Sequence, residues 1–384
     1  MAIDNVPLTE LRQRTSAKWR YYQPDALPAW VAEMDFTLAH PIAQALHAAI
    51  DRSDTGYRWA DEVPEALVQF CRHEWQWSFD AEQVIVLADV MSGIAQALVH
   101  LTELRSQVVI NPPVYPPFFS TVEHVTQRVV REVPLVRVDS GYRIDLVALE
   151  EAFSDPRVQA YVLCSPHNPT GTVHSAEELL RVAQLAAQHN VLVIADEIHA
   201  PMTLAGAQHH PFLMVADGVA NVRAVSCVSA SKTWNIPGLK CAQLVAMDAV
   251  VERLREAIPL EATFGVGHFG VLGTLAAYRD GAAWRKEMLE VLDRRRRQLR
   301  DGLAQFEDVD MTWPHASYLA WVRMPILGED PAAVLMEEAQ LVVNSGLAFG
   351  APGVSHARIN YATSEAILGE IIERVGAVID AQKS

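Results

Sequence analysis

Short runs of consecutive apolar residues, separated by longer stretches with helical spacing, are the feature that most constrains the fold of this 384-residue chain. The runs are Val84–Leu87, Val108–Ile110, Tyr161–Cys164, Val191–Ala195 and Val222–Val228. They are rich in β-branched residues and do not alternate with polar residues, which is typical of strands buried on both faces. Between two of them, Ala176–His189 has the spacing of an amphipathic helix. The pattern predicts an α/β fold with a largely parallel, helix-covered sheet.

The pattern changes after residue 265, where a long helical stretch, 287–303, leads into strands and helices at shorter spacing. A single core seldom grows beyond about 250–300 residues, so the length also favours two domains. We expect a large domain over 41–270 and a small domain over 271–384. Residues 1–40, dense in Trp and Tyr, are expected to form an arm that packs on the rest. Asp330-Pro331 predicts a helix start, and the helix should end near Ala339.

Composition argues against several functional classes. The net charge of −16 repels nucleic-acid backbones, and the one basic run, Arg294–Arg297, is expected to form a solvated helix face. Four cysteines without metal spacing predict reduced, mostly buried thiols. No signal-like segment and no run of about 18 apolar residues is present, so we expect a cytoplasmic protein that does not bind membranes. A small-molecule ligand is favoured.

Polar residues follow several of the predicted strands. Lys232 lies in Ser229-Ala230-Ser231-Lys232, Asp196 ends another run, and Asn168 lies in a turn stiffened by two prolines. Ser92-Gly93-Ile94 is expected to open a helix whose first amides can bind an anion. Singly, these are equally explained as a surface lysine, a salt-bridge carboxylate, a loop and a Ser N-cap. Together, at the carboxyl ends of strands, they are the groups that pyridoxal 5′-phosphate requires.

Longer motifs extend this interpretation. They are Trp30–Phe36, Asn111–Phe118, Ser165–Gly171, Asp196–His199 and Ser231–Leu239. With them the chain resembles the fold-type I pyridoxal-phosphate enzymes of the aminotransferase class I/II superfamily, and within it the MalY/PatB-type cystathionine β-lyases. The resemblance implies the aspartate aminotransferase fold: a mostly parallel seven-stranded sheet sandwiched by helices in a large cofactor-binding domain, and a smaller α+β C-terminal domain. It also implies that the arm contributes to the small domain and the substrate mouth.

The resemblance also implies roles for single residues. Lys232 would bind the cofactor covalently and then act as the base at Cα, Asp196 would bond the pyridine nitrogen, and Tyr115 would stack on the ring. Asn168 and His199 would lie at the phenolic oxygen. The phosphate would be held by the amides of Gly93 and Ile94, by Ser229 and Lys240 and, in a homodimer, by Tyr57 of the neighbouring subunit. Ser92 and Ser231 would also bind the cofactor. The substrate would contact Arg358, which grips its carboxylate, and Trp30, Glu33 and Asn168.

Three positions depart from the family pattern. Lys240 stands where many relatives have Arg, which binds phosphate through two nitrogens. Glu33 stands where the lyases usually have Asp, and Pro314–Tyr318 replaces the usual Glu-Gly-Thr/Ser-Tyr. His209-His210 has no further ligand at suitable spacing, so no metal site is predicted.

The resemblance leaves more than one function open. The first hypothesis is a β-lyase that cleaves L-cystathionine or related cysteine S-conjugates to a thiol, pyruvate and ammonia. The second is an aminotransferase, because both reactions use every residue named above. The third is a regulatory or binding protein that has kept the fold without turnover. The joint presence of Lys232, Asp196, Asn168 and Arg358 argues against the third.

Overall fold

The computed structural model describes residues 2–138 and 141–383, so residue 1 of the predicted arm lies outside it. Its larger sheet has the strand order β2-β10-β9-β8-β7-β3-β4. Only β10 runs antiparallel to its neighbours. The strands span Val84–Leu87 (β2), Gln107–Ile110 (β3), Val129–Glu132 (β4), Val158–Cys164 (β7), Leu192–Asp196 (β8), Arg223–Val228 (β9) and Ala242–Ala246 (β10). The predicted α/β fold with a mostly parallel seven-stranded sheet is confirmed.

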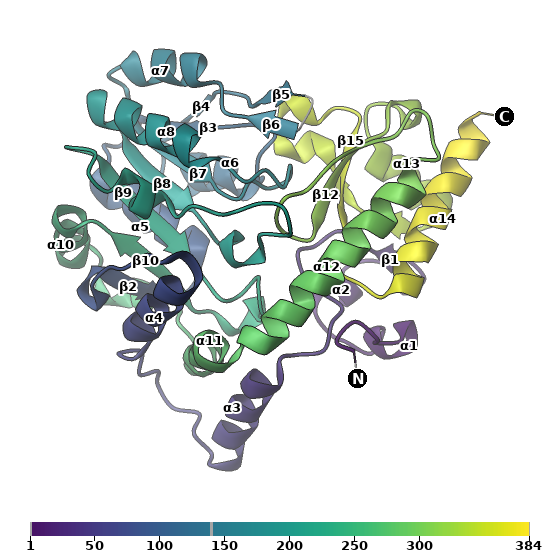
Figure 1. Ribbon diagram of the computed structural model, residues 1–384, viewed down its shortest axis with the longest axis horizontal. Helices are drawn as coiled ribbons and strands as arrows, with labels where there is room; N and C mark the ends of the chain where they lie inside the picture. Colours follow the sequence, from purple (N-terminus) through teal and green to yellow (C-terminus); the bar gives the residue numbers. More distant parts are fainter. Residues whose placement is uncertain (1, 139–140, 384) are drawn as a thin grey trace.

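The central strands β7, β8, β9 and β10 are buried on both faces, which explains why segments such as β8 are unbroken apolar runs, whereas the edge strand β4 is largely exposed. In β8, Val193 and Ala195 belong to one core cluster, whereas Leu192 and Ile194 belong to another. The covering helices are visible in Figure 1. They include α4 (Val63–Trp75), α5 (Val90–Leu101), α7 (Leu146–Ser154), α8 (Ala176–Gln188), α9 (Phe212–Ala216) and α10 (Asp248–Ala257). Polar side chains just after the strands therefore collect at one edge, above the buried layers.

A four-stranded antiparallel sheet, in the order β11-β12-β15-β14, forms the C-terminal part. Its strands are Asp310–Thr312 (β11), Leu319–Arg323 (β12), Asn344–Ser345 (β14) and His356–Asn360 (β15), and its helices are α12 (Ala282–Leu303), α13 (Pro331–Ala339) and α14 (Glu365–Gln382). In Figure 1, α12 crosses the molecule beside α14. The N-terminal arm joins this part, because β1 (Leu27–Pro28) pairs with β13 (Leu341–Val342).

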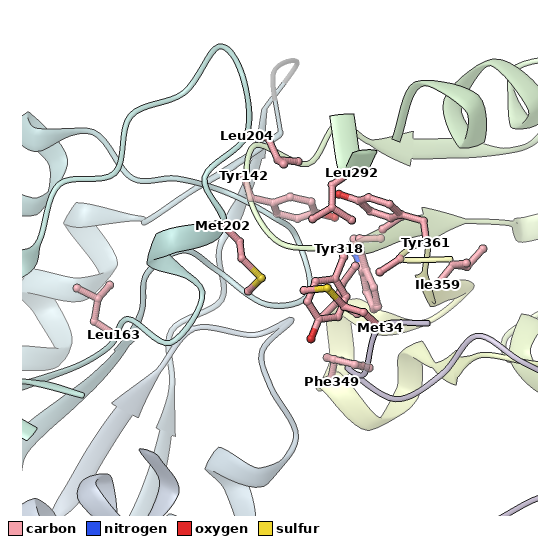
Figure 2. Close-up of a cluster of buried hydrophobic side chains, with 14 of the residues drawn as sticks. Met34, Tyr142, Leu163, Met202, Leu204, Leu292, Tyr318, Phe349, Ile359 and Tyr361 are labelled. Carbon is pink, nitrogen blue, oxygen red and sulfur yellow. The ribbon is translucent and has the colours of Figure 1, made fainter. Parts of the chain in front are cut away.

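The remaining elements connect these parts. They are α1 (Leu8–Leu11), α2 (Ala17–Arg20), α3 (His40–Asp51), α6 (Pro117–Ser120), α11 (His268–Asp280), β5 (Val136–Val138) and β6 (Gly141–Arg143). The expected boundary between residues 270 and 271 falls inside α11, so the division into 41–270 and 271–384 stays a prediction. One apolar cluster runs across that division, and Figure 2 shows side chains from both sides of it, among them Met34, Met202 and Tyr318.

The structure corrects two expectations about local structure. Arg295 and Arg296 are buried, 6% and 1% exposed, where a solvated face was expected. Arg295 pairs with Asp4, and Arg296 pairs with Asp293 and donates to the carbonyl of Pro314, so these charges are neutralised internally. Asp330 does precede α13, but its side chain makes no capping hydrogen bond.

Two other features concern the cysteines and the lengths of the apolar helices. All four cysteines are free and buried, as expected. Within residues 2–138 and 141–383, no helix combines the length and the apolar character needed to cross a bilayer.

Candidate active site

A cavity of about 190 Å³ opens at the carboxyl ends of the parallel strands. It collects residues from loops that are far apart in the sequence. Its lining consists of Ala32, Asp89, Val90, Met91, Tyr115, Cys164, Asn168, Asp196, Ile198, His199, Ser231, Lys232, Pro237 and Lys240. Seven of the predicted site residues are in this set, namely Tyr115, Asn168, Asp196, His199, Ser231, Lys232 and Lys240.

Lys232 is held in the turn after β9 and donates from Nζ to the carbonyl oxygen of Ala32 at 3.1 Å. Burial, followed by the positive charge of Arg358, lowers the pKa of Lys232 to about 8. An amine with this pKa is neutral far more often at physiological pH than an ordinary lysine. The side chain is therefore prepared for nucleophilic attack on a carbonyl and for proton transfer.

This lowered pKa predicts how the protein reacts with an aldehyde. We expect the rate of capture of pyridoxal by Lys232 to rise with pH and to reach half of its maximum near pH 8, because only the neutral amine attacks. Stopped-flow absorbance over a pH series measures the midpoint. In Arg358→Gln, which lacks the positive charge that lowers the pKa of Lys232 most after burial, the midpoint should move upward. A wild-type midpoint near the ordinary value of 10.5 would contradict the proposed environment.

Asp196 ends β8 and is 5% exposed, and its Oδ1 accepts a hydrogen bond from the amide of Ile198 at 3.1 Å. Burial raises the pKa of Asp196 to about 7. A cationic partner in the cavity would stabilise the charged carboxylate and lower this pKa again. Asp196 is thus placed to pair with a protonated nitrogen.

His199 follows in the turn that begins after Asp196, so the strand has ended before it and its ring can reach the cavity. It is 4% exposed, and burial lowers its pKa to about 3, so the ring is neutral. Its Nδ1 is buried and has no hydrogen-bond partner among the described residues. A buried polar atom in this state suits a ligand that supplies the missing hydrogen bond.

Arg358 on β15 does not line the cavity itself, but it contacts Asn168, which does. Its guanidinium donates to Asn168 Oδ1 at 3.0 Å, to the carbonyl of Trp30 at 3.0 Å and to Asn344 Oδ1 at 2.6 Å. It lies over the ring of Phe349 and is 5% exposed. Burial lowers its pKa to about 10, so it keeps its charge at neutral pH. Its partners in these contacts are neutral oxygens, so they do not balance its positive charge.

Tyr115 occupies the proline-rich turn after β3 and packs edge-to-face on Phe118, with ring centroids 5.7 Å apart. Burial raises the pKa of its hydroxyl, which is therefore protonated at neutral pH. Its ring forms one wall of the cavity, as a stacking role requires.

The expected anion site at the start of α5 needs a correction. The helix begins at Val90 with Asp89 as its N-cap, not at Ser92-Gly93-Ile94. The amide of Gly93 already donates to the Asp89 carbonyl, and Ile94 is buried in the core. Val90 and Met91, whose amides belong to the first turn and have no acceptor within the helix, line the cavity instead.

Other predicted residues do not line the cavity. Ser229 donates its hydroxyl to the Cys241 carbonyl at 2.8 Å, and the Glu33 carboxylate accepts from Ser16 at 2.6 Å. Trp30 contributes its carbonyl to Arg358, while its ring packs against Tyr21 and Tyr22. Tyr57 is fully exposed to solvent, and Ser92 bonds Asp89. The roles of these side chains stay predictions.

Contacts of the arm complete the site and were missed from the sequence. Asn235 exchanges two hydrogen bonds with the backbone of Met34, at 2.8 and 2.9 Å. Asn360 donates to the carbonyls of Val31 and Glu33, both at 2.7 Å. A sequence motif marked this segment, but its partners lie more than 200 residues away. These bonds fix the Ala32 carbonyl that accepts from Lys232.

His209, half of the histidine pair, lies 3.2 Å from the buried Glu197. Within the part of the chain that the structure describes, no group of three or more His, Cys, Asp and Glu is arranged to hold a metal ion.

The family model for aminotransferase class I and II matches residues 32–375. The chain belongs to this family. A Mycobacterium tuberculosis protein named "Putative cystathionine beta-lyase" is 40% identical over 97% of both chains. "Cystathionine beta-lyase PatB" of Bacillus subtilis is 31% identical over 92% of this chain and 93% of its own. The predicted resemblance to PatB-type lyases is confirmed.

The fold comparison agrees. A crystal structure from Corynebacterium diphtheriae, described as a "putative plp-dependent beta-cystathionase", superposes with a TM-score of 0.92 and 29% identity, covering 98% of this chain and 99% of that one. The predicted fold type is therefore confirmed over nearly the whole length of this chain.

Proposed function

We propose that this protein is a pyridoxal phosphate-dependent carbon–sulfur β-lyase that cleaves L-cystathionine or related cysteine S-conjugates. The observation that carries the proposal is the meeting of Lys232, Asp196, Asn168 and His199 in one cavity, with Arg358 bonded to Asn168. The full-length likeness to proteins named cystathionine β-lyases supports the choice of reaction.

The donors and acceptors in the cavity fit this cofactor. Lys232 offers an amine, Asp196 a carboxyl group for the ring nitrogen, and Asn168 and His199 polar groups for the phenolic oxygen. Tyr115 offers an aromatic wall. The Nδ1 of His199 is buried and accepts or donates no hydrogen bond within the described part of the chain, and such a ligand would supply one.

When bound, the cofactor supplies an electron-accepting ring that stabilises negative charge at the substrate Cα. Asp196 holds a proton at the ring nitrogen, and so keeps that ring electron-poor. Lys232 Nζ takes the proton from Cα, for which its lowered pKa suits it. Arg358 binds the substrate α-carboxylate and fixes which bond of Cα faces the amine.

The reaction then depends on the leaving group at Cβ. Loss of the Cα proton and of a thiolate from Cβ forms a carbon–carbon double bond, and water converts the released enamine to pyruvate and ammonia. A thiolate is a good leaving group, which favours elimination over transfer of the amino group. The aminotransferase alternative uses the same residues and differs only in needing a keto acid as acceptor.

An assay without any added keto acid tests the proposed function. We expect the purified holoenzyme to form pyruvate, ammonia and a thiol catalytically from L-cystathionine and from other S-substituted cysteines. Lactate dehydrogenase coupling measures pyruvate, and a thiol reagent measures the second product. Turnover that appears only after addition of 2-oxoglutarate would establish the aminotransferase instead. Cofactor binding without turnover in either assay would favour a regulatory protein.

We also propose that the protein acts as a homodimer in which Tyr57 reaches the cofactor site of the neighbouring subunit. Tyr57 is fully exposed, Trp59 is 71% exposed and Phe264 is 68% exposed. Arg58 bonds Thr263, so these aromatic side chains share one region of the surface. In Figure 1 the segment that carries Tyr57 and Trp59 is the connection between α3 and α4. Exposed apolar area of this kind is typical of a protein interface.

Subunit mixing tests the shared site. Tyr57→Ala and Lys232→Ala should each be nearly inactive, because one lacks the donated Tyr and the other lacks the amine. After co-refolding in equal amounts, activity should return to about a quarter of the wild-type value. About half of the dimers are then hybrids, and each hybrid has one intact site instead of two. A Lys232→Ala and Asp196→Asn mixture is the matched control and should stay inactive, because both changes fall in the same half-site. Equal recovery in both mixtures would contradict the proposal.

A further inference from the structure

Asp89, at the start of α5, was not among the residues predicted from the sequence, yet it lines the cavity. Its Oδ1 accepts from both the amide and the hydroxyl of Ser92, each at 2.8 Å. Its Oδ2 lies 3.0 Å from the Nζ of Lys240. One carboxylate thus binds three donors, two from Ser92 and one from Lys240, and of these two residues only Lys240 is in the cavity lining.

These donors are the ones that a phosphate group would use. Lys240 was predicted from the sequence to hold the cofactor phosphate and Ser92 to bind the cofactor. Val90 and Met91, whose amides belong to the first turn of α5, line the cavity together with Asp89 and Lys240. Helix starts of this kind bind anions. An anion belonging to the protein itself is therefore already bound at this subsite.

The carboxylate is charged at neutral pH. Burial alone would raise the pKa of Asp89, but hydrogen bonds from Ser92 and Lys240 outweigh burial and lower it. Lys240, with 51% of its side chain exposed, contributes one positive charge, which Asp89 balances. The pair brings no net positive charge to a phosphate.

We propose that Asp89 competes with the cofactor phosphate inside the protein. Its carboxylate binds Lys240 and Ser92, and it therefore weakens the binding of the phosphate group by these residues. The proposal rests on the cofactor assigned under the proposed function. It predicts that the phosphate of pyridoxal phosphate adds less to the affinity for the cofactor than it would if the same donors were not bound to Asp89. It also predicts easier exchange of the cofactor.

Asp89→Asn tests this inference, because Asn caps helices as well as Asp but carries no charge. Cofactor-free protein is titrated with pyridoxal phosphate and, separately, with pyridoxal, which lacks the phosphate. Absorbance of the covalent adduct gives both dissociation constants. We expect the dissociation constant for pyridoxal phosphate to fall about tenfold in the variant, because the charge pair that is removed is partly exposed to solvent. The dissociation constant for pyridoxal should change less than about twofold.

Further variants ensure that the test does not depend on Asp89→Asn alone. Lys240→Gln should weaken pyridoxal phosphate binding by a larger factor in the Asp89→Asn background than in the wild type, because Asp89 no longer engages the lysine. Asp89→Ser, which also retains a capping oxygen, replaces Asp89→Asn if the thermal unfolding midpoint of the latter drops. An unchanged or higher constant for pyridoxal phosphate, or an equal gain for pyridoxal, would overturn the inference. Failure of the wild type to bind either aldehyde would instead overturn the proposed function.

Discussion

Lys232→Ala is expected to lose turnover by about 10⁴-fold or more, together with the visible absorbance of the bound cofactor. Both losses have one cause, since the same amine binds the cofactor covalently and moves the Cα proton. The substitution removes a hydrogen bond to the Ala32 carbonyl, which faces the cavity, so folding should be retained. Turnover is measured by pyruvate formation, and the adduct by absorbance before and after borohydride.

Lys240→Ala is the matched control, because Lys240 lines the same cavity. We expect this variant to keep the adduct at saturating pyridoxal phosphate and to keep measurable turnover. Thermal unfolding of both variants without cofactor shows whether either substitution disturbs the fold. If Lys232→Ala still formed the adduct and Lys240→Ala did not, the nucleophile would be assigned to the wrong lysine.

Asp196→Asn should lower kcat by about 10²–10³-fold while leaving the covalent adduct in place. Asn is nearly isosteric, and its amide oxygen can still accept from Ile198, so the turn should be preserved. What is lost is the negative charge that keeps the ring nitrogen protonated. The two readouts separate, because the adduct depends on the Lys232 amine, whereas turnover depends on the ring as an electron acceptor.

Glu197→Gln provides the control for Asp196. Glu197 is the next carboxylate in the sequence and equally buried, but it accepts from the amide of Phe212 and faces His209, outside the cavity lining. We expect it to affect the free energy of unfolding more than kcat. Comparable losses of kcat in both variants, or retention of most activity in Asp196→Asn, would argue against the role given to Asp196.

Much of the large sheet could be predicted because burial on both faces leaves unbroken apolar runs. The bounds of β2 match Val84–Leu87, and β8 and β9 differ from the expected runs by about one residue. The antiparallel strand β10 was not recognised. Its segment, Ala242–Ala246, contains the polar residue Gln243, and its sequence does not distinguish a strand from a loop that leads into a helix. Lys232, Asp196 and Asn168 could be named in advance as residues of the cavity because each belongs to one of the motifs that follow a predicted strand.

What the sequence could not supply depends on tertiary contacts. Asp89 and Ser92 are both good N-cap residues, and only the structure shows that Asp89 caps α5 and also pairs with Lys240. The partner of the Ser229 hydroxyl, the carbonyl of Cys241, is likewise set by the pairing of β9 with β10. The burial of Arg295 follows from Asp4 at the other end of the chain, which no local pattern reveals.

The central claim is that the amine of Lys232 carries pyridoxal phosphate in the cavity at the edge of the sheet. Holoenzyme reduced with borohydride, digested and examined by mass spectrometry tests it directly, because reduction fixes the cofactor on the residue that holds it. We predict one modified peptide, bearing the phosphopyridoxyl group on Lys232, in amounts close to one per chain. A modified peptide with the group on Lys240 or another lysine, or no modified peptide after incubation with excess cofactor, would contradict the account.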